Sequence, residues 1–245
     1  MCTHFAAIPL TKLEEAIEAV RRAPESGGCE ALATKLGEAV VGAGETQAET
    51  GTAEATDTVQ DVYPGSSCPV ILVREGRLAA QEMAFGYEAP WLERPGRGGK
   101  LVANARIENA LGRPEGMWAE SLARRRCLVP AWGFYEPHRT RTRRSPRTGR
   151  TIKQQVFFSL AGSDNGSAVP EAADGRPASS TPAFLAGIYQ DGRFAIVTCA
   201  PNASVSPVHD RMPIVLRPAE ARVWLGPRYA TLADRTSLPL ASRDA

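Results

Sequence analysis

Short runs of hydrophobic residues, most of them long enough for a single strand, recur along the chain. The most strand-like run extends from Cys127 to Glu136, and its Pro130 favours a bulge or an edge position because proline cannot donate a ladder hydrogen bond. Two further runs, Cys68–Val73 and Leu78–Tyr87, flank a polar turn and therefore predict a hairpin. The remaining predicted strands are Val156–Ala161, Ala183–Tyr189 and Phe194–Thr198. The segment Leu101–Arg106 begins as a strand and leads towards a short helix.

Helical spacing of hydrophobic residues is confined to a few short segments. Leu13, Ile17 and Val20 recur at intervals of three and four residues, so residues 12–22 are expected to form an amphipathic helix. Further helices are expected at Glu30–Val40, where the pattern is weaker, and at Trp118–Arg126 and Pro218–Leu225.

Many short strands, few helices and no regular alternation of the two favour an α+β fold. We expect a single domain over residues 1–230, built around a strongly curved, barrel-like, mostly antiparallel sheet with short flanking helices, followed by a C-terminal tail at 231–245. Three segments rich in small, polar or basic residues cannot bury enough apolar surface to offset their ordering entropy. We interpret them as flexible insertions, at about 42–58, 139–153 and 163–181.

Charge is distributed unevenly, although the formal net charge is only +2. Residues 1–60 contain four Lys or Arg and ten Asp or Glu, whereas residues 93–153 contain fifteen basic and five acidic residues. Such segregation points to a polyanionic partner. The basic run Arg139–Arg150 alone is also compatible with a solvated surface loop.

Other functional classes are disfavoured by composition. No run of 18 apolar residues and no secretory signal pattern is present, so we expect no contact with a membrane. Five widely spaced cysteines without a Cys-x-x-Cys pair favour a reducing, cytoplasmic environment over a disulfide framework or a zinc site. The sequence also lacks a Gly-rich phosphate loop and metal-ligand spacing, so we expect no cofactor, and we expect a monomer.

A cysteine at position 2 has a chemistry that no internal cysteine offers. If Met1 is removed, Cys2 carries an α-amine, with a pKa of about 7.7–8.0, beside a thiol with a pKa of about 8.5. The amine can condense with an aldehyde to a Schiff base, and the thiolate can then close a thiazolidine ring on the same carbon. The N-terminus could therefore capture an aldehyde covalently.

Four segments together resemble the SOS-response-associated peptidase (SRAP) family, whose members cross-link to abasic sites in single-stranded DNA. Each segment is weakly specific alone, but the four occur in the family's order and span nearly the whole chain. They are Met-Cys at 1–2, Asn-Ala-Arg at 104–106, Arg-Cys-Leu-Val-Pro-Ala and Gly-Phe-Tyr-Glu at 126–131 and 133–136, and His-Asp-Arg-Met-Pro at 209–213.

The resemblance implies four catalytic residues. Cys2 would be the nucleophile, and Asn104 would orient its amine. Glu136 would act as general acid or base at the ring oxygen of the sugar, and His209 would transfer protons near neutral pH. Taken alone, Asn104 could equally be a helix cap and Glu136 a surface residue.

The same resemblance implies that the partner is single-stranded DNA with abasic sites. Phosphates would be bound by arginines, whose planar group donates two hydrogen bonds at once, and bases would stack on aromatic rings. The aromatic residues can also be read as core. The candidates are Arg106, Arg113 and Arg211 for phosphates, and Phe85, Tyr87, Trp118 and Trp132 for bases.

Some positions depart from the family pattern. Thr3 and His4 follow Cys2 where the family usually has Gly-Arg, and Pro137 follows Glu136 where the family usually has Trp. These departures concern contacts with DNA, and all four catalytic residue types are present. Two alternatives remain open: a thiol peptidase or amidase using Cys2 and His209, and a non-catalytic nucleic-acid-binding module using Arg139–Arg150.

Overall fold

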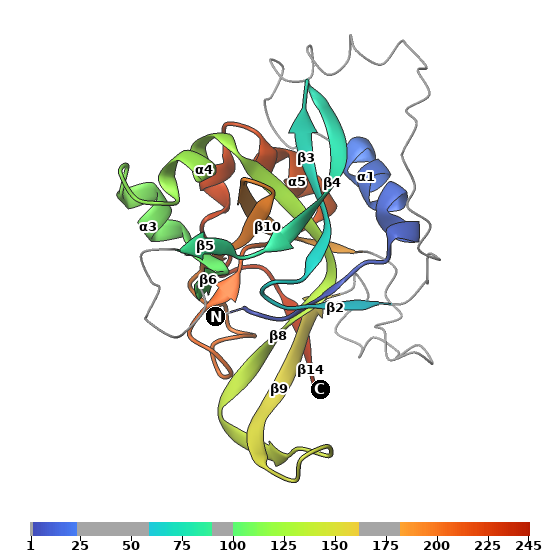
Figure 1. Cartoon of the computed structure of the whole chain (residues 1–245), viewed down its shortest axis with the longest axis vertical. Helices are drawn as coiled ribbons and strands as arrows, with labels where there is room; N and C mark the ends of the chain where they lie inside the picture. Colours follow the sequence, from blue (N-terminus) through green and yellow to red (C-terminus); the bar gives the residue numbers. More distant parts are fainter. Residues whose placement is uncertain (1, 24–58, 90–99, 162–181) are drawn as a thin grey trace.

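The computed structural model describes residues 2–23, 59–89, 100–161 and 182–245. This part of the chain consists mostly of strands (Figure 1). They are β1 (Phe5–Ala7), β2 (Gln60–Val62), β3 (Ser67–Arg74), β4 (Arg77–Phe85), β5 (Tyr87–Ala89), β6 (Lys100–Val102), β7 (Asn104–Arg106), β8 (Arg126–Arg144), β9 (Thr151–Leu160), β10 (Ala183–Gln190), β11 (Arg193–Cys199), β12 (Met212–Pro213), β13 (Val215–Leu216) and β14 (Leu240–Asp244).

The helices are short, as expected. Residues 118–126 are helical only in their middle, because the chain enters β8 at Arg126. The weak helix predicted at Glu30–Val40 lies outside the described residues. The helices are α1 (Leu13–Arg22), α3 (Ile107–Gly112), α4 (Ala119–Arg124) and α5 (Pro218–Leu225, with Pro218 in its first turn), with 3-10 turns η1 (Leu10–Lys12) and η3 (Tyr229–Leu232).

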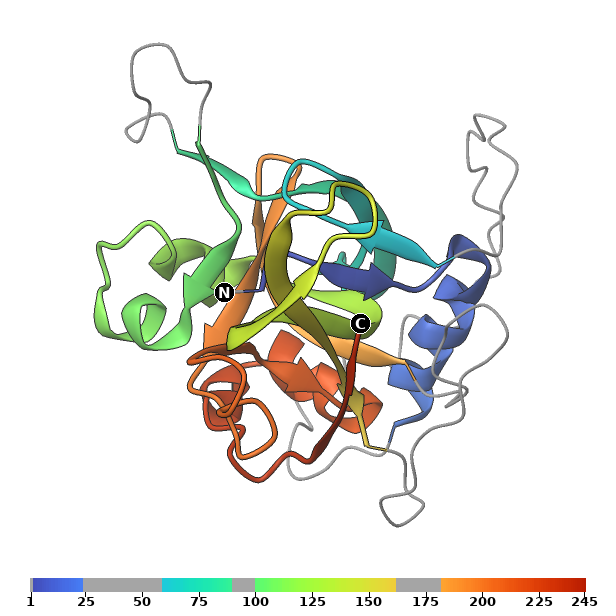
Figure 2. The same ribbon diagram turned by 90° about the horizontal axis from the view of Figure 1, so that it is seen from below.

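The strands form a strongly curved sheet that closes on itself. Strands β10, β11, β4, β3 and β8 pair in that order, and β8 pairs again with β10 to close the ring. Pairing is antiparallel except where β11 runs parallel to β4 and β7. The predicted α+β class and curved, mostly antiparallel sheet are therefore confirmed. Figure 2 shows the helices lying around the outside of the strands.

The ring interior is filled by aromatic and aliphatic side chains. Phe85 is fully buried, and its ring stacks on that of Phe194 with centroids 5.0 Å apart, while Phe5 meets the Phe85 ring edge-on at 5.5 Å. On the outside, α5 packs on the ring through Trp224, whose Nε1–H donates to the carbonyl of Cys127 at 3.0 Å. The first residues of the chain are thus built into the core.

Strand β8 is much longer than the predicted ten residues. Its pairing with β1 shifts between Ala131 and Gly133, so Trp132 sits in a bulge close to the predicted irregularity at Pro130. Gly133 is required beside this bulge, because a Cβ there would lie 2.1 Å from the carbonyl oxygen of Phe158 in β9. The two strands can therefore approach closely just before Glu136.

Two predicted irregular segments are ordered parts of the sheet. Residues 139–153, predicted to be a flexible insertion, continue β8 and β9 as a hairpin, with Thr142 paired to Lys153. The predicted tail at 231–245 contains η3 and ends in β14, which pairs with β9. Sequence reasoning failed here because exposed hairpins and edge strands lack the apolar alternation that marks buried strands. The other predicted insertions, 42–58 and 163–181, lie outside the described residues.

Within the described residues, every helix is too short or too polar to cross a membrane.

Candidate active site

The N-terminal segment reaches the site because β1 pairs with β8. Phe5 lies opposite Phe134, and the carbonyl oxygen of His4 accepts the N–H of Tyr135 at 2.9 Å. The same oxygen accepts the thiol of Cys2, with Sγ 3.7 Å away. Cys2 is therefore held beside the residue that directly precedes Glu136.

A second set of strands positions Asn104 and His209. Strand β11 pairs with β7 on one side, where Ile196 lies opposite Asn104, and with β12 on the other, where Cys199 lies opposite Met212. His209 precedes β12 by three residues. Both views show the first described residues lying beside this group of strands (Figures 1 and 2).

Glu136 and His209 face each other directly. Glu136 is completely buried, and its Oε2 lies 3.7 Å from Nε2 of His209, whose side chain is 17% exposed. The other side of the imidazole is held by its neighbours: Nδ1 lies 3.0 Å from Oδ1 of Asp210 and 3.1 Å from the backbone nitrogen of Arg211. The ring is thus fixed with Nε2 towards the carboxyl group.

Burial sets the protonation of these groups. It raises the pKa of Glu136 to about 7, and the negative charge of Asp210 acts in the same direction. It lowers the pKa of His209, against the opposing effect of Asp210. It raises the pKa of the Cys2 thiol well above its ordinary value, and Glu136 adds to this increase. At neutral pH the site therefore holds a protonated thiol, a neutral imidazole and a carboxyl group near half protonation, which suits proton transfer.

Asn104 is a strand residue and not the helix cap that its isolated sequence position also allowed. It lies in β7, and the N-cap of α3 is Arg106. Its side chain is buried, and its Oδ1 accepts no hydrogen bond from the described residues. A buried carbonyl oxygen without a donor is costly, and such groups are uncommon outside functional sites. This acceptor is available for a substrate or for an amine at the N-terminus.

Arg211 does not occupy the place expected of a phosphate ligand. Its guanidinium group forms a bidentate ion pair with Glu108 of α3 at 2.6 and 2.9 Å and donates to the carbonyl of Thr198 at 3.0 Å. Its side chain is only 12% exposed. Arg211 therefore ties the His209 loop to α3 and β11, a role that the arginine motif alone did not reveal.

The other predicted DNA contacts divide into exposed and buried groups. Arg106 and Arg113, at the two ends of α3, are exposed and remain accessible to phosphate. Phe85 is packed in the ring, and Trp118 is buried with its ring 5.0 Å from that of Tyr87, so in this structure none of these three rings presents a face to a base. Trp132 is half-buried against the core.

Sequence reasoning missed two residues that support the site. His4 is sandwiched between Tyr63 and Tyr135, with ring centroids 4.2 and 4.0 Å away, and its Nε2 lies 3.0 Å from Oδ1 of Asp61. Asn202 is buried and accepts the N–H of Val205, which lies in the turn (203–208) that precedes His209. His4 could have been noticed because it stands where the family usually has Arg. Asn202, a single Asn in a loop, gave no such signal in the sequence.

The chain is similar to several abasic site processing proteins at low sequence identity. The chain is 28% identical over 147 residues to the abasic site processing protein YoqW of Bacillus subtilis, covering 60% of this chain and 57% of that protein. It is 28% identical over 166 residues to the abasic site processing protein YedK of Escherichia coli, covering 67% and 63%. The chain thus matches less than two thirds of the length of these relatives.

Solved structures support the fold. A phage-related protein from Bordetella bronchiseptica, 19% identical, superposes with a TM-score of 0.56 over all of this chain and 94% of its own. A protein from Bacteroides thetaiotaomicron, 17% identical, gives 0.55 over 99% and 91%.

The sequence profile of one family extends over almost the entire chain, from residue 1 to residue 243, and so includes all four predicted catalytic positions. The chain therefore belongs to the SOS response associated peptidase (SRAP) family.

Proposed function

We propose that this protein, after removal of Met1, captures abasic sites in single-stranded DNA by forming a thiazolidine between Cys2 and the C1′ aldehyde of the lesion. The observation that carries the proposal is the contact between Glu136 and His209 at 3.7 Å, next to a cysteine anchored to the strand that bears Glu136. Family membership and the names of the relatives support DNA with abasic sites as the partner.

The chemistry needs no oxidant or cofactor. The α-amine of Cys2 adds to the aldehyde, loss of one water gives the Schiff base, and the thiol adds to the same carbon to close the ring. The product is the sum of protein and DNA less one water molecule. Proton transfers are required at each of these steps and at the opening of the sugar ring.

Each partner of the cysteine suits one of these transfers. Glu136, with its pKa raised to about 7, can donate a proton to the sugar ring oxygen and later accept one from the thiol. His209, neutral at physiological pH and next to Glu136, can exchange a proton with it. Asn104 offers the amine an acceptor that no described residue uses, and Arg106 and Arg113 are exposed for phosphates.

The test is adduct formation with a synthetic abasic single strand. We expect wild-type protein to give an adduct that survives denaturing electrophoresis. Cys2→Ala keeps an amine and should give only a Schiff base, seen after borohydride reduction but not without it. Failure of wild-type protein lacking Met1 to form any adduct would reject the proposal. Turnover of peptides that depends on Cys2, without an adduct, would instead identify a thiol peptidase.

A further inference from the structure

A basic hairpin projects from the sheet next to the candidate site. In Figure 1 the outer part of β8 and β9 extends away from the strand ring. We call residues 138–153 the basic arm. This segment contains no Asp, Glu, Phe, Trp or Tyr. Its exposed cationic residues are Arg139, Arg141, Arg143, Arg144, Arg147, Arg150 and Lys153.

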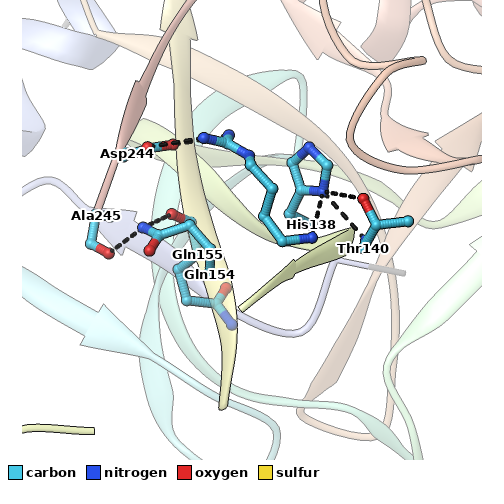
Figure 3. Close-up of polar contacts among 7 residues, drawn as sticks. His138, Thr140, Gln154, Gln155, Asp244 and Ala245 are labelled. Atoms are coloured by element: carbon cyan, nitrogen blue, oxygen red, sulfur yellow. Dashed lines mark hydrogen bonds and ion pairs between the residues drawn. The ribbon is translucent and has the colours of Figure 1, made fainter. Parts of the chain in front are cut away.

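The basic arm has a defined geometry. Pairing between β8 and β9 shifts between Pro137 and Thr142, which creates a bulge at the root of the arm. The imidazole of His138 closes this bulge, because its Nδ1 accepts the backbone N–H groups of Thr140 at 3.2 Å and Arg141 at 3.1 Å (Figure 3). At the tip, the backbone N–H of Ser145 donates to the carbonyl of Arg150 at 2.8 Å.

The C-terminus fixes the direction of the arm. Arg141 forms a bidentate ion pair with Asp244 of β14 at 2.9 and 2.8 Å. Gln154 donates to the carbonyl of Ala245 at 3.0 Å, and the N–H of Ala245 donates to Gln155 at 2.9 Å (Figure 3). Among the described residues, the other six cations of the arm form no ion pair. Their mutual repulsion is therefore uncompensated within this part of the chain.

The root of the arm adjoins the candidate site. Arg139 follows Glu136 by three residues in the same strand, and its backbone N–H donates to the carbonyl of Val208 at 3.1 Å. Val208 directly precedes His209. A DNA strand with its lesion at Glu136 and His209 would therefore meet the arm as it leaves the site.

We propose that the basic arm binds the sugar-phosphate backbone of the single strand that extends from the captured lesion. This inference rests on the proposed function. Six cations on an ordered ribbon, none of them in an ion pair with another described residue, suit a polyanion, whose binding releases condensed counterions. Because the arm lacks aromatic residues on which bases could stack, binding should not depend on base sequence.

The test compares two variants with equal loss of charge. The arm variant is Arg143→Gln, Arg144→Gln, Arg147→Gln and Arg150→Gln. The control variant carries Arg21→Gln, Arg22→Gln, Arg74→Gln and Arg124→Gln, which are exposed on α1, β3 and α4, away from the arm in Figure 1. Affinity for undamaged single strands is measured at several salt concentrations in a Cys2→Ala background, and adduct formation is measured with Cys2 intact.

We expect the arm variant to bind a strand of about 20 nucleotides on the order of tenfold more weakly than the control variant at low salt. Its slope of log affinity against log salt should be smaller by up to about 3, since each phosphate contact on a single strand contributes about 0.7. Its adduct rate with an abasic strand of about four nucleotides, too short to reach the four substituted arginines in the outer part of the arm, should equal that of the control.

Three results would overturn the arm assignment while leaving the proposed function intact. The first is that the two variants bind undamaged single strands with equal affinity. The second is that the arm variant, relative to the control, forms its adduct as slowly with the short abasic strand as with the long one. The third is that the arm variant loses more affinity for duplex than for single-stranded DNA. Absence of any adduct with either strand in wild-type protein would reject the proposed function instead. Thermal unfolding of both variants verifies that they remain folded.

Discussion

Oε2 of Glu136 and Nε2 of His209 lie 3.7 Å apart, although one residue is fully buried in β8 and the other is in a loop before β12. The link between their segments is made by the backbone contact of Arg139 with Val208. A carboxyl group and an imidazole in this relation share protons readily, and each changes the charge that the other faces. Four predictions follow from the groups around this pair.

Glu136→Gln should stabilise the protein at alkaline pH. The folded pKa of Glu136 is about 7, above its ordinary value near 4.5, so the folded state binds more protons than the unfolded state between these values. The contribution of Glu136 to the free energy of unfolding is fully present below about pH 4.5 and is lost as pH rises through 7. This change amounts to about 3 kcal/mol at most. We expect Glu136→Gln to gain about 2–3 kcal/mol over wild type at pH 8 and little at pH 4, measured by urea unfolding.

Glu115→Gln is the matched control, because it removes an exposed carboxylate in a turn. It should leave the pH dependence of unfolding unchanged. If Glu136→Gln behaved like this control, burial of the ionised Glu136 carboxylate would not destabilise the folded protein.

His209→Ala should slow adduct formation by about 10²–10⁴-fold, the range for loss of a proton-transfer group. Asp210→Asn should have a much smaller effect, because the Asp210 side chain is 72% exposed and its charge is screened by solvent. Single-turnover rates across a range of pH would separate the two. A comparable loss in both variants would assign the catalytic role to the pair and contradict a role for the imidazole alone.

Asn104→Ala should slow the adduct without destabilising the fold. Among the described residues no group donates to Oδ1 of Asn104, so its removal relieves a desolvation cost of about 1–3 kcal/mol, while the hydrogen bond proposed for the amine of Cys2 is lost. The measurements are the adduct rate and the free energy of unfolding of the same preparation. A destabilised variant with a normal rate would make Asn104 a purely structural residue.

His4→Ala should loosen the anchor of the N-terminal segment. Loss of the two ring contacts, with Tyr63 and Tyr135, should destabilise the protein by about 1–3 kcal/mol, given about 0.5–1.5 kcal/mol for each aromatic pair. The adduct rate should fall because the thiol of Cys2 donates to the carbonyl oxygen of His4. His4→Phe keeps the stack but lacks the contact with Asp61, and it should recover most of both losses; no recovery would assign the effect to the contact with Asp61.

Part of this fold could be predicted from the sequence, because elements that bury one face space their hydrophobic residues periodically. The core strands β3, β10 and β11 and the helix α1 follow hydrophobic spacing closely, and they were predicted. The basic hairpin and β14 were not, since their pairing depends on backbone hydrogen bonds between exposed, polar residues. Hydrophobic periodicity indicates which side chains an element buries, but it does not indicate which strand its backbone pairs with.

The site residues were predicted from motifs, and their arrangement could only come from the folded structure. Cys2, Asn104, Glu136 and His209 were named from their motifs, and the structure shows a direct contact between the last two. Arg211 shows the limit of a motif: arginine is a residue type that suits phosphate, but the guanidinium group of Arg211 pairs with Glu108, from a helix distant in the sequence. A partner such as Glu108, which competes with phosphate for the arginine, is revealed only by the three-dimensional structure.

Capture of the lesion by Cys2 is tested most directly by the mass of the adduct and the position of its bond to the protein. Wild-type protein lacking Met1 is incubated with an abasic single strand, and the product is analysed by intact mass and by peptide mapping. We predict a mass equal to protein plus DNA less one water, stable without borohydride, with the DNA on the peptide that begins at Cys2. An adduct located on another residue, or one formed equally well by protein that retains Met1, would contradict the account.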